Sequence, residues 1–151
     1  NGVYLTGPSS NFFQIDVTPA ATRLASHLDQ VVFYNSQTST FNSIQVKNVY
    51  NYSDARAKNS IQSLSQSLSI IKQLRPVSYN FTDNSDNTKF RKGGDGKEIG
   101  LLAQEVEQVL PNIVLTDPDG NKLINYTSLI AVLIDAVKDL NEKVAALEAQ
   151  Q

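Results

Sequence analysis

Ser53 and Lys58 are the two residues of this chain whose types and spacing could do chemistry together. They bound the segment 53–58, where a polar, weakly charged sequence gives way to a more strongly charged one. A serine hydroxyl becomes a nucleophile when a base removes its proton, and a lysine is such a base only when its amine is neutral. Burial or a nearby positive charge favours the neutral amine. Arg56 could supply that charge, although pairing with Asp54 would reduce its effect.

The peptide bond between Tyr52 and Ser53 is the one best placed for attack. The Ser53 hydroxyl would reach the Tyr52 carbonyl through a five-membered ring and form an ester, which water then opens. Five residues along an α-helix rotate by about 500°, so Ser53 and Lys58 would not share a helix face. Ser53 must therefore precede the helix that carries Lys58, or Lys58 must come from another copy of the chain. Free backbone N–H groups at the start of a helix could also stabilise an oxyanion.

The same six residues have a purely structural interpretation. Serine is a favoured N-cap, so segment 53–58 could be a capped helix start with a solvated lysine. Taken alone, the spacing favours this interpretation over a catalytic one, because serine is common in the chain.

Composition excludes several other kinds of site. There is no Cys and only one His, His27, so thiol catalysis and multi-histidine metal centres are excluded, and we expect no metal and no cofactor. A formal net charge of −2 argues against nucleic-acid binding through a basic surface. No apolar run approaches the roughly 20 residues that span a bilayer, so we expect no membrane partner.

Residues 1–52 predict a β-rich segment without a core of its own. They hold four charged residues among many Ser, Thr, Asn and Gln. Three runs have strand character, namely 12–17, 30–34 and 43–50. So short a β segment buries little by itself. We therefore expect it to complete its core with residues outside this sequence or with neighbouring copies.

Residues 53–151 predict a mixed helical and stranded domain. The helix Ile61–Leu74, stopped by Pro76, and the helix Ala103–Leu110, stopped by Pro111, follow from apolar spacing. The predicted strands are 77–81, 99–102 (short and buried), 113–115 and 122–124, with a loop over 82–96 and a turn at 117–120. The predicted fold class is α+β.

The C-terminal helix carries the clearest pattern. Its apolar residues alternate steps of three and four and form a seam: Ile130, Leu133, Val137, Leu140, Val144 and Leu147. Thr127 or Ser128 could cap its start. The seam covers fewer than three heptads, so packing on its own domain and packing on partner helices are both open.

Several motifs taken together resemble one known family. They are the Ser-Asp-x-Arg-x-Lys segment at 53–58, Ile-x-x-Leu-x-Pro-Val-x-Tyr at 71–79, Gly-Leu-Leu-Ala-Gln-Glu-Val at 100–106 with Leu-Pro at 110–111, Asn-Tyr-x-x-Leu-Ile at 125–130, and Asp-Ala-Val-Lys-x-Leu-Asn at 135–141. Residues 53–151 resemble the intramolecular chaperone auto-processing domain of phage tailspikes, tail fibres and endosialidases, which also occurs in myelin regulatory factor.

The resemblance implies a homotrimeric domain that guides its own upstream fibre into a trimer and then cuts itself off. It implies that Ser53 is the nucleophile, Lys58 its base, and Tyr52–Ser53 the cleaved bond, with Asp54 and Arg56 as supporting motif residues. Residues 1–52 would then be the end of a β-rich fibre or tailspike, acting as substrate and folding client. The fibre would reach the virion after assembly in the host cytoplasm, where the released chaperone stays.

Two alternatives remain open. The domain could be a structural trimerisation module that does not cut. It could also serve a membrane-tethered transcription factor of the myelin regulatory type, which we rank last because the upstream segment has little charge.

Overall fold

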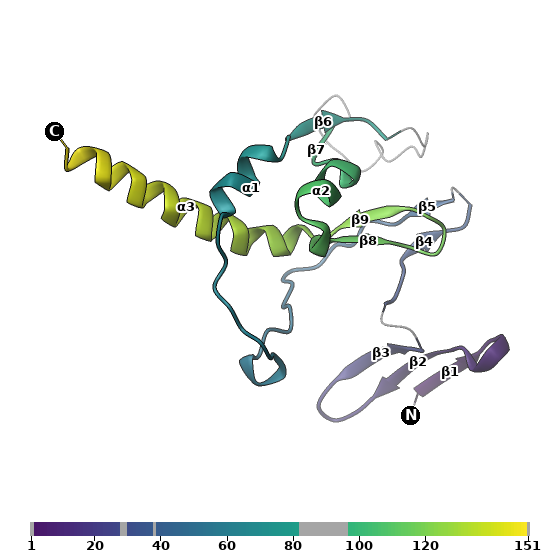
Figure 1. Cartoon of the computed structure of the whole chain (residues 1–151). Coiled ribbons are helices and arrows are strands. Elements are labelled where there is room, and N and C mark those ends of the chain that lie inside the picture. Colours follow the sequence, from purple (N-terminus) through teal and green to yellow (C-terminus); the bar gives the residue numbers. More distant parts are fainter. Residues whose placement is uncertain (1, 28–29, 38, 82–96, 151) are drawn as a thin grey trace. The chain divides into compact units, whose positions relative to one another are not determined.

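The computed structural model describes residues 2–27, 30–37, 39–81 and 97–150. The chain divides into two compact units, Asn1–Asn51 and Tyr52–Gln151. Both Ser53 and Lys58 therefore belong to the second unit. Figure 1 shows the elements of each unit.

The first unit contains two small antiparallel sheets. One has the order β1-β2-β3, formed by Gly2–Thr6, Phe12–Val17 and Thr22–Ser26. The other pairs β4 (Tyr34–Asn35) with β5 (Thr40–Phe41). Among the described residues of this unit, none is buried. The described residues of this unit therefore form no hydrophobic core within a single chain, in agreement with the expectation from its sequence.

The three strands expected in this unit have different outcomes. The strand at 12–17 is confirmed as β2. The strand predicted for 30–34 is wrong except at Tyr34, where β4 begins. The strand predicted for 43–50 is also wrong, because these residues form no strand. A strand needs a neighbour to accept its ladder hydrogen bonds, and an apolar pattern alone does not supply one. Strands β1 and β3 exist because both pair with β2.

The second unit combines three α-helices with two hairpins among its described residues. The helices are α1 (Ser67–Gln73), α2 (Ala103–Val109) and α3 (Tyr126–Glu148). The antiparallel hairpins pair β6 (Val77–Tyr79) with β7 (Glu98–Gly100), and β8 (Val114–Thr116) with β9 (Lys122–Ile124). Two 3-10 turns, Ala55–Ala57 and Pro111–Ile113, complete the unit. This mixture confirms the α+β class.

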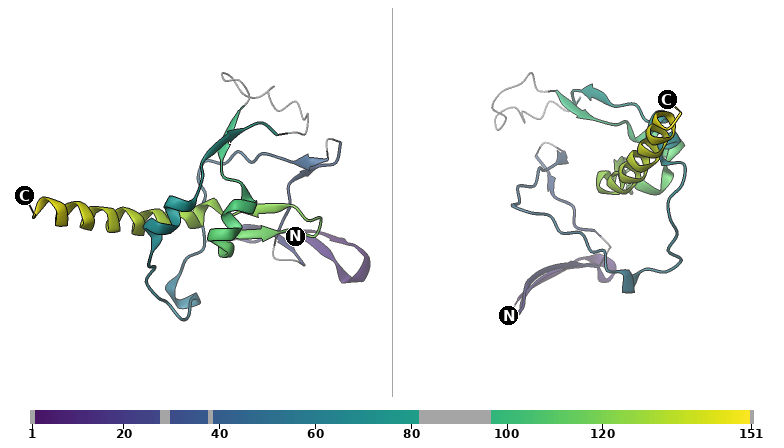
Figure 2. Two further views of the ribbon diagram at one scale, coloured as in Figure 1. Left: turned by 45° about the horizontal axis from the view of Figure 1, so that its top comes forward. Right: turned by 90° about the vertical axis from the view of Figure 1, so that its left-hand side faces the viewer.

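The core of the second unit is small. Val106 of α2, Ile113 and Leu129 of α3 form its buried cluster. Further along α3, Val132 and Ala136 are buried on the same side of the helix, and α1 packs on α3. The views in Figure 2 agree that α1 lies beside α3.

Several predicted boundaries in this unit are wrong. The helix predicted for 61–74 begins only at Ser67, after Gln66 in a left-handed conformation with φ 61°. Ile61 and Leu64 are exposed, and a helical segment without a surface to pack on is only marginally stable in water. The predicted buried strand at 99–102 exists as β7, but Ile99 is 84% exposed. The loop predicted for 82–96 lies outside the described residues.

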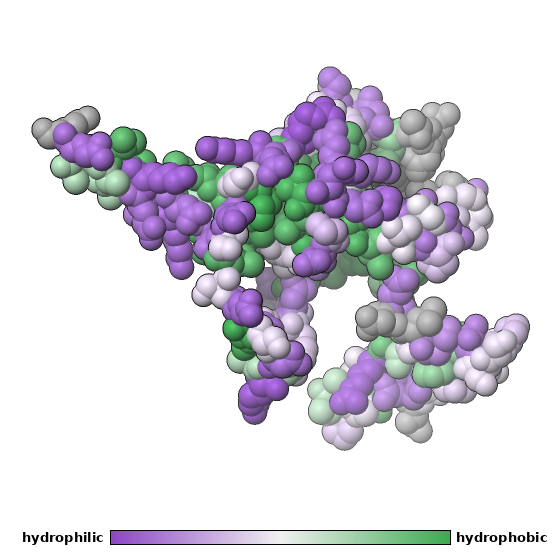
Figure 3. Space-filling model, viewed as in Figure 1, coloured by the Kyte–Doolittle hydropathy of each residue, from purple (hydrophilic) through white to green (hydrophobic). Residues whose placement is uncertain are grey.

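Helix α3 leaves the predicted seam uncovered. All six seam residues are exposed, by between 45% and 63%: Ile130, Leu133, Val137, Leu140, Val144 and Leu147. The face that packs within the chain is a different one, and Figure 3 shows apolar side chains at the surface along this helix. The predicted caps Thr127 and Ser128 are wrong, because the N-cap is Asn125, whose side chain accepts the Ser128 N–H at 3.3 Å.

Candidate active site

A short 3-10 turn joins Ser53 to Lys58. The Ala57 N–H donates to the Asp54 carbonyl at 3.1 Å, and the Lys58 N–H donates to the Ala55 carbonyl at 3.0 Å. Asp54 and Lys58 flank the turn with extended backbone angles. A 3-10 turn closes i to i+3 bonds and is tighter than an α-helix. The chain therefore reverses between Ser53 and Lys58 without forming an α-helix.

The turn places the two side chains of interest in direct contact. The Lys58 Nζ donates to the Ser53 Oγ at 2.7 Å. This separation lies within the roughly 2.6–3.2 Å expected between a nucleophile and its base. The α-helical geometry that would have separated them does not arise, since Ser53 precedes the turn and Lys58 follows it. The contact forms within a single chain, on the residue that contributes the nitrogen of the Tyr52–Ser53 peptide bond.

Asp54 and Arg56 form an ion pair inside the same turn. The Arg56 Nη2 donates to the Asp54 Oδ2 at 2.6 Å, and its Nε lies 3.1 Å from both carboxylate oxygens. The Arg56 backbone N–H also donates to Oδ1 at 2.9 Å. The Arg56 side chain, followed by its backbone N–H, lowers the pKa of Asp54, and the Asp54 carboxylate raises the pKa of Arg56. The positive charge of Arg56 is thus paired with Asp54.

The whole turn is open to water in the single chain. Ser53 and Lys58 are both exposed, and Tyr52 is 84% exposed. The single chain has the geometry of a nucleophile and its base. Its described residues do not supply the water-free surroundings that would activate the lysine.

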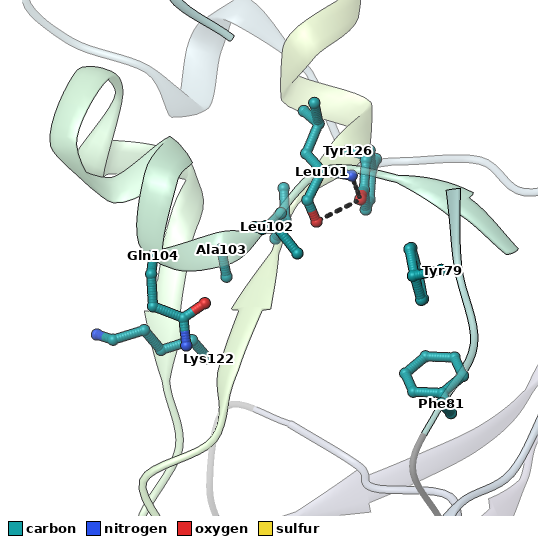
Figure 4. Close-up of a pocket in the computed structure, with 9 residues that line it drawn as sticks. Tyr79, Phe81, Leu101, Leu102, Ala103, Gln104, Lys122 and Tyr126 are labelled. Atoms are coloured by element: carbon teal, nitrogen blue, oxygen red, sulfur yellow. Dashed lines mark hydrogen bonds between the residues drawn. The ribbon is translucent and has the colours of Figure 1, made fainter. Parts of the chain in front are cut away.

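A separate concavity of about 330 Å³ lies between the β6–β7 hairpin, α2 and the start of α3. Figure 4 shows Tyr79, Phe81 and Tyr126 around it, with Leu101 and Gln104. The Tyr126 hydroxyl accepts the Leu101 N–H at 2.8 Å. The sequence pattern did not predict this pocket, because its walls come from three separate segments between Tyr79 and Tyr126. Its lining offers an apolar surface with polar edges.

The described residues contain neither a membrane-spanning helix nor a cluster of metal ligands. No helix in the described ranges is long and apolar enough to cross a membrane. Within the same ranges, no group of three or more His, Cys, Asp and Glu side chains could hold a metal ion.

Two carboxylates of α2 make ion pairs with residues of neighbouring segments. Glu105 pairs with Arg75, which follows α1, and Glu107 accepts from the Lys122 Nζ at 2.7 Å. These ion pairs connect α2 with the segment after α1 and with the β8–β9 hairpin. The turn at 117–120 is confirmed, with the Asp117 carboxylate accepting the N–H groups of Asp119 and Asn121.

Part of the second unit, including this turn, matches a known protein family. Residues 53–115 match the family described as the chaperone of endosialidase, peptidase family S74. This segment of the chain therefore belongs to that family, and the resemblance found in the sequence is confirmed.

The chain is also similar to tail fibre proteins of bacteriophages. It is 32% identical to the long tail fibre protein Gp37 of Enterobacteria phage K3, and also of phage T2, over 124 residues that make up 78% of this chain and 9% of each relative. The Gp37 protein of Escherichia phage AR1 is 32% identical over 108 residues, 68% of this chain and 9% of the relative. The chain thus spans about 9% of the length of these curated relatives.

Proposed function

We propose that residues 53–151 are an intramolecular chaperone that drives trimerisation and folding of a phage tail fibre or tailspike and then releases itself by cleaving the Tyr52–Ser53 bond. The observation that carries the proposal is the 2.7 Å contact between the Lys58 Nζ and the Ser53 Oγ, immediately next to that bond. Membership of a family named both chaperone and peptidase supports the same conclusion.

The chemistry needs only groups of this turn and water. Neutral Lys58 takes the proton of the Ser53 hydroxyl, and the oxygen attacks the Tyr52 carbonyl carbon. The bond between that carbon and the Ser53 nitrogen then breaks, and the nitrogen leaves as an amine after receiving a proton from Lys58. The resulting ester joins Tyr52 to the Ser53 oxygen. Water hydrolyses this ester, which leaves a carboxylate on Tyr52 and a free amine on Ser53.

The exposed seam of α3 supports an assembly of several copies. Six apolar side chains at heptad spacing stay in water in the single chain, and burying a side chain of this kind stabilises by about 1.5–3 kcal/mol. The proposal assigns three copies on the basis of the family resemblance. Contact with neighbouring chains would remove water from Lys58 and so couple cleavage to completed assembly.

A removable chaperone fits the properties of the upstream unit, which we propose is the end of the fibre. Its strands pair within the chain, but its described residues have no core, so its sheets need surfaces of other chains to cover their apolar side chains. Pairing strands between chains is slow, and holding three chains together raises their effective concentration. Cleavage then removes the assembling device, so that the fibre persists kinetically in the virion while the chaperone stays in the host cytoplasm.

Four variants of the 151-residue chain test the peptidase part on denaturing gels and by mass spectrometry. Ser53→Ala and Lys58→Ala should stay whole, whereas the wild type yields a fragment that ends at Tyr52. Lys58→Arg keeps a charged donor but cannot become a neutral base, so it should also stay whole. Ser63→Ala removes an exposed hydroxyl outside the turn, so this variant should be cleaved like the wild type. Cleavage in Lys58→Ala would remove Lys58 from the mechanism.

A second pair of variants tests the assembly part. Leu140→Lys places a charge in the α3 seam and should yield monomers that do not cut. Glu142→Lys introduces the same residue at an exposed polar position of α3 and should assemble like the wild type. Light scattering after size-exclusion chromatography measures the mass of each assembly. A Leu140→Lys protein that still forms trimers would contradict the role of the seam.

The alternative function is a trimerisation module that does not cut. The exposed position of both Ser53 and Lys58 favours this alternative, because solvated lysine is a poor base. A wild-type trimer that contains only intact chains after prolonged incubation would establish it.

A further inference from the structure

The Asp54–Arg56 ion pair belongs to the turn that joins Ser53 to Lys58. The Arg56 side chain and backbone together donate every hydrogen bond recorded for the Asp54 carboxylate, at distances between 2.6 and 3.1 Å. The Arg56 side chain is itself 91% exposed. A side chain this exposed stabilises the turn little by packing, so Arg56 stabilises it through its hydrogen bonds to Asp54.

One consequence of the pair is conformational. Five extended residues span about 17 Å, yet the Ser53 and Lys58 side chains meet at 2.7 Å. The chain must therefore bend sharply at 54–57. The Asp54 carboxylate promotes this bend by accepting the Arg56 N–H, which is the bond of an N-cap.

A second consequence is electrostatic. A carboxylate next to Ser53 would attract the Lys58 ammonium and oppose its loss of a proton. In the structure the planar guanidinium of Arg56 makes a two-pronged contact with both carboxylate oxygens, in which Nε donates to Oδ1 and Nη2 donates to Oδ2. Among the described residues, Lys58 forms no ion pair, and its recorded side-chain contact is with Ser53.

We infer that Asp54 and Arg56 are positioning residues for self-cleavage: Arg56 holds the Asp54 carboxylate as the cap of the turn and keeps it from pairing with Lys58. The inference rests on the proposed function for its reaction. The hydrogen bond to the Ser53 Oγ comes from Lys58, so Asp54 and Arg56 act on the reaction through Lys58. In this arrangement the Asp54 carboxylate is bonded to Arg56, while the Lys58 amine is bonded to the Ser53 hydroxyl.

The first test measures cleavage rate against pH. Arg56→Gln frees the carboxylate, so the midpoint of the rising limb should move to a pH about half a unit higher. At a fixed pH on that limb, the cleavage rate should then fall about threefold. Asp54→Asn combined with Arg56→Gln removes the carboxylate charge but keeps an N-cap residue, so the midpoint should return toward that of the wild type. The shift should shrink at about 1 M salt. A uniform slowing at every pH, without a shifted midpoint, overturns the inference.

The second test does not depend on cleavage and uses the Ser53→Ala background. Acetic anhydride modifies neutral amines, so peptide mass spectrometry reports Lys58 acetylation relative to the exposed Lys143 of the same chain. Acetylation should fall by about threefold in Arg56→Gln and recover in the double variant. Lys72→Gln removes a positive charge elsewhere and should leave Lys58 acetylation unchanged. Equal acetylation in all variants overturns the inference.

The two tests separate this inference from the proposed function. A wild-type chain that never cuts, at any pH, refutes the peptidase function. The acetylation comparison then still decides whether Arg56 keeps the Asp54 carboxylate from Lys58.

Discussion

Gly100→Ala should destabilise the second unit through one defined clash. A Cβ built at Gly100 would lie 2.7 Å from the Tyr126 hydroxyl oxygen and 3.4 Å from the Tyr79 ring. The first separation is well inside an ordinary carbon–oxygen contact, and the second is ordinary. Overpacking of this kind costs about 1–3 kcal/mol. The lower backbone entropy of the unfolded alanine chain offsets about 0.4–1 kcal/mol, so the net cost should be about 1–2 kcal/mol.

Removing the hydroxyl should remove the clash. Tyr126→Phe alone loses the bond accepted from the Leu101 N–H and should cost about 1 kcal/mol. In that background the clash with the hydroxyl is gone and the contact with the Tyr79 ring is ordinary, so Gly100→Ala should be neutral or should stabilise by up to about 1 kcal/mol. The double variant is then more stable than the sum of the single variants predicts, by about 1 kcal/mol or more.

Urea unfolding of the four proteins, followed by circular dichroism in the Ser53→Ala background, measures these free energies. That background keeps each sample a single uncut species. Measurements at two protein concentrations separate folding from assembly, which depends on concentration. Additive costs within about 0.3 kcal/mol would refute the reasoning, because they would show that Gly100 and Tyr126 do not meet in the folded chain.

Two further predictions follow from burial and from the titration of one turn. Val106 is 1% exposed, so Val106→Ala should lower the free energy of unfolding by about 2 kcal/mol. Val137→Ala on the exposed seam is the control. It should change the free energy of unfolding by less than about 0.5 kcal/mol when the chain is monomeric. The Asn121 side chain lowers the pKa of Asp117, so its stabilisation is present above the unfolded value of about 3.9 and is lost as pH falls through the folded value. The difference in melting temperature between the wild type and Asp117→Ala should therefore be smaller at about pH 2 than at about pH 6, and an unchanged difference would contradict this assignment.

The residues of the turn were readable from sequence, and the way they meet was not. The sequence placed a serine, a carboxylate, a guanidinium and an amine within six residues. Helical geometry left open whether Ser53 and Lys58 meet within one chain. The structure resolves the backbone as a 3-10 turn between extended flanks, which a helix-or-strand pattern does not predict. The catalytic roles stay a proposal.

Helices and hairpins with strong local signals were predicted well. Pro111 and the 117–120 turn mark boundaries that backbone chemistry imposes locally, and α2, β8 and β9 follow them closely. The runs at 30–34 and 43–50 failed as strands because strand formation depends on a partner elsewhere in the chain. The helix expected from Ile61 starts late for a related reason, since its first apolar residues find no surface to cover.

The sequence by itself determined the family, the α+β class and the heptad spacing of α3, because each depends on residue types in a local order. Only the tertiary structure decided which face of α3 is used within the chain. Leu129, Val132 and Ala136 are buried, while the seam that begins at Ile130 stays in water. Periodicity shows that a helix has an apolar stripe, but which neighbour covers it depends on where the other elements pack. Here α1 and the core of α2 cover one face of α3 and leave the heptad seam open.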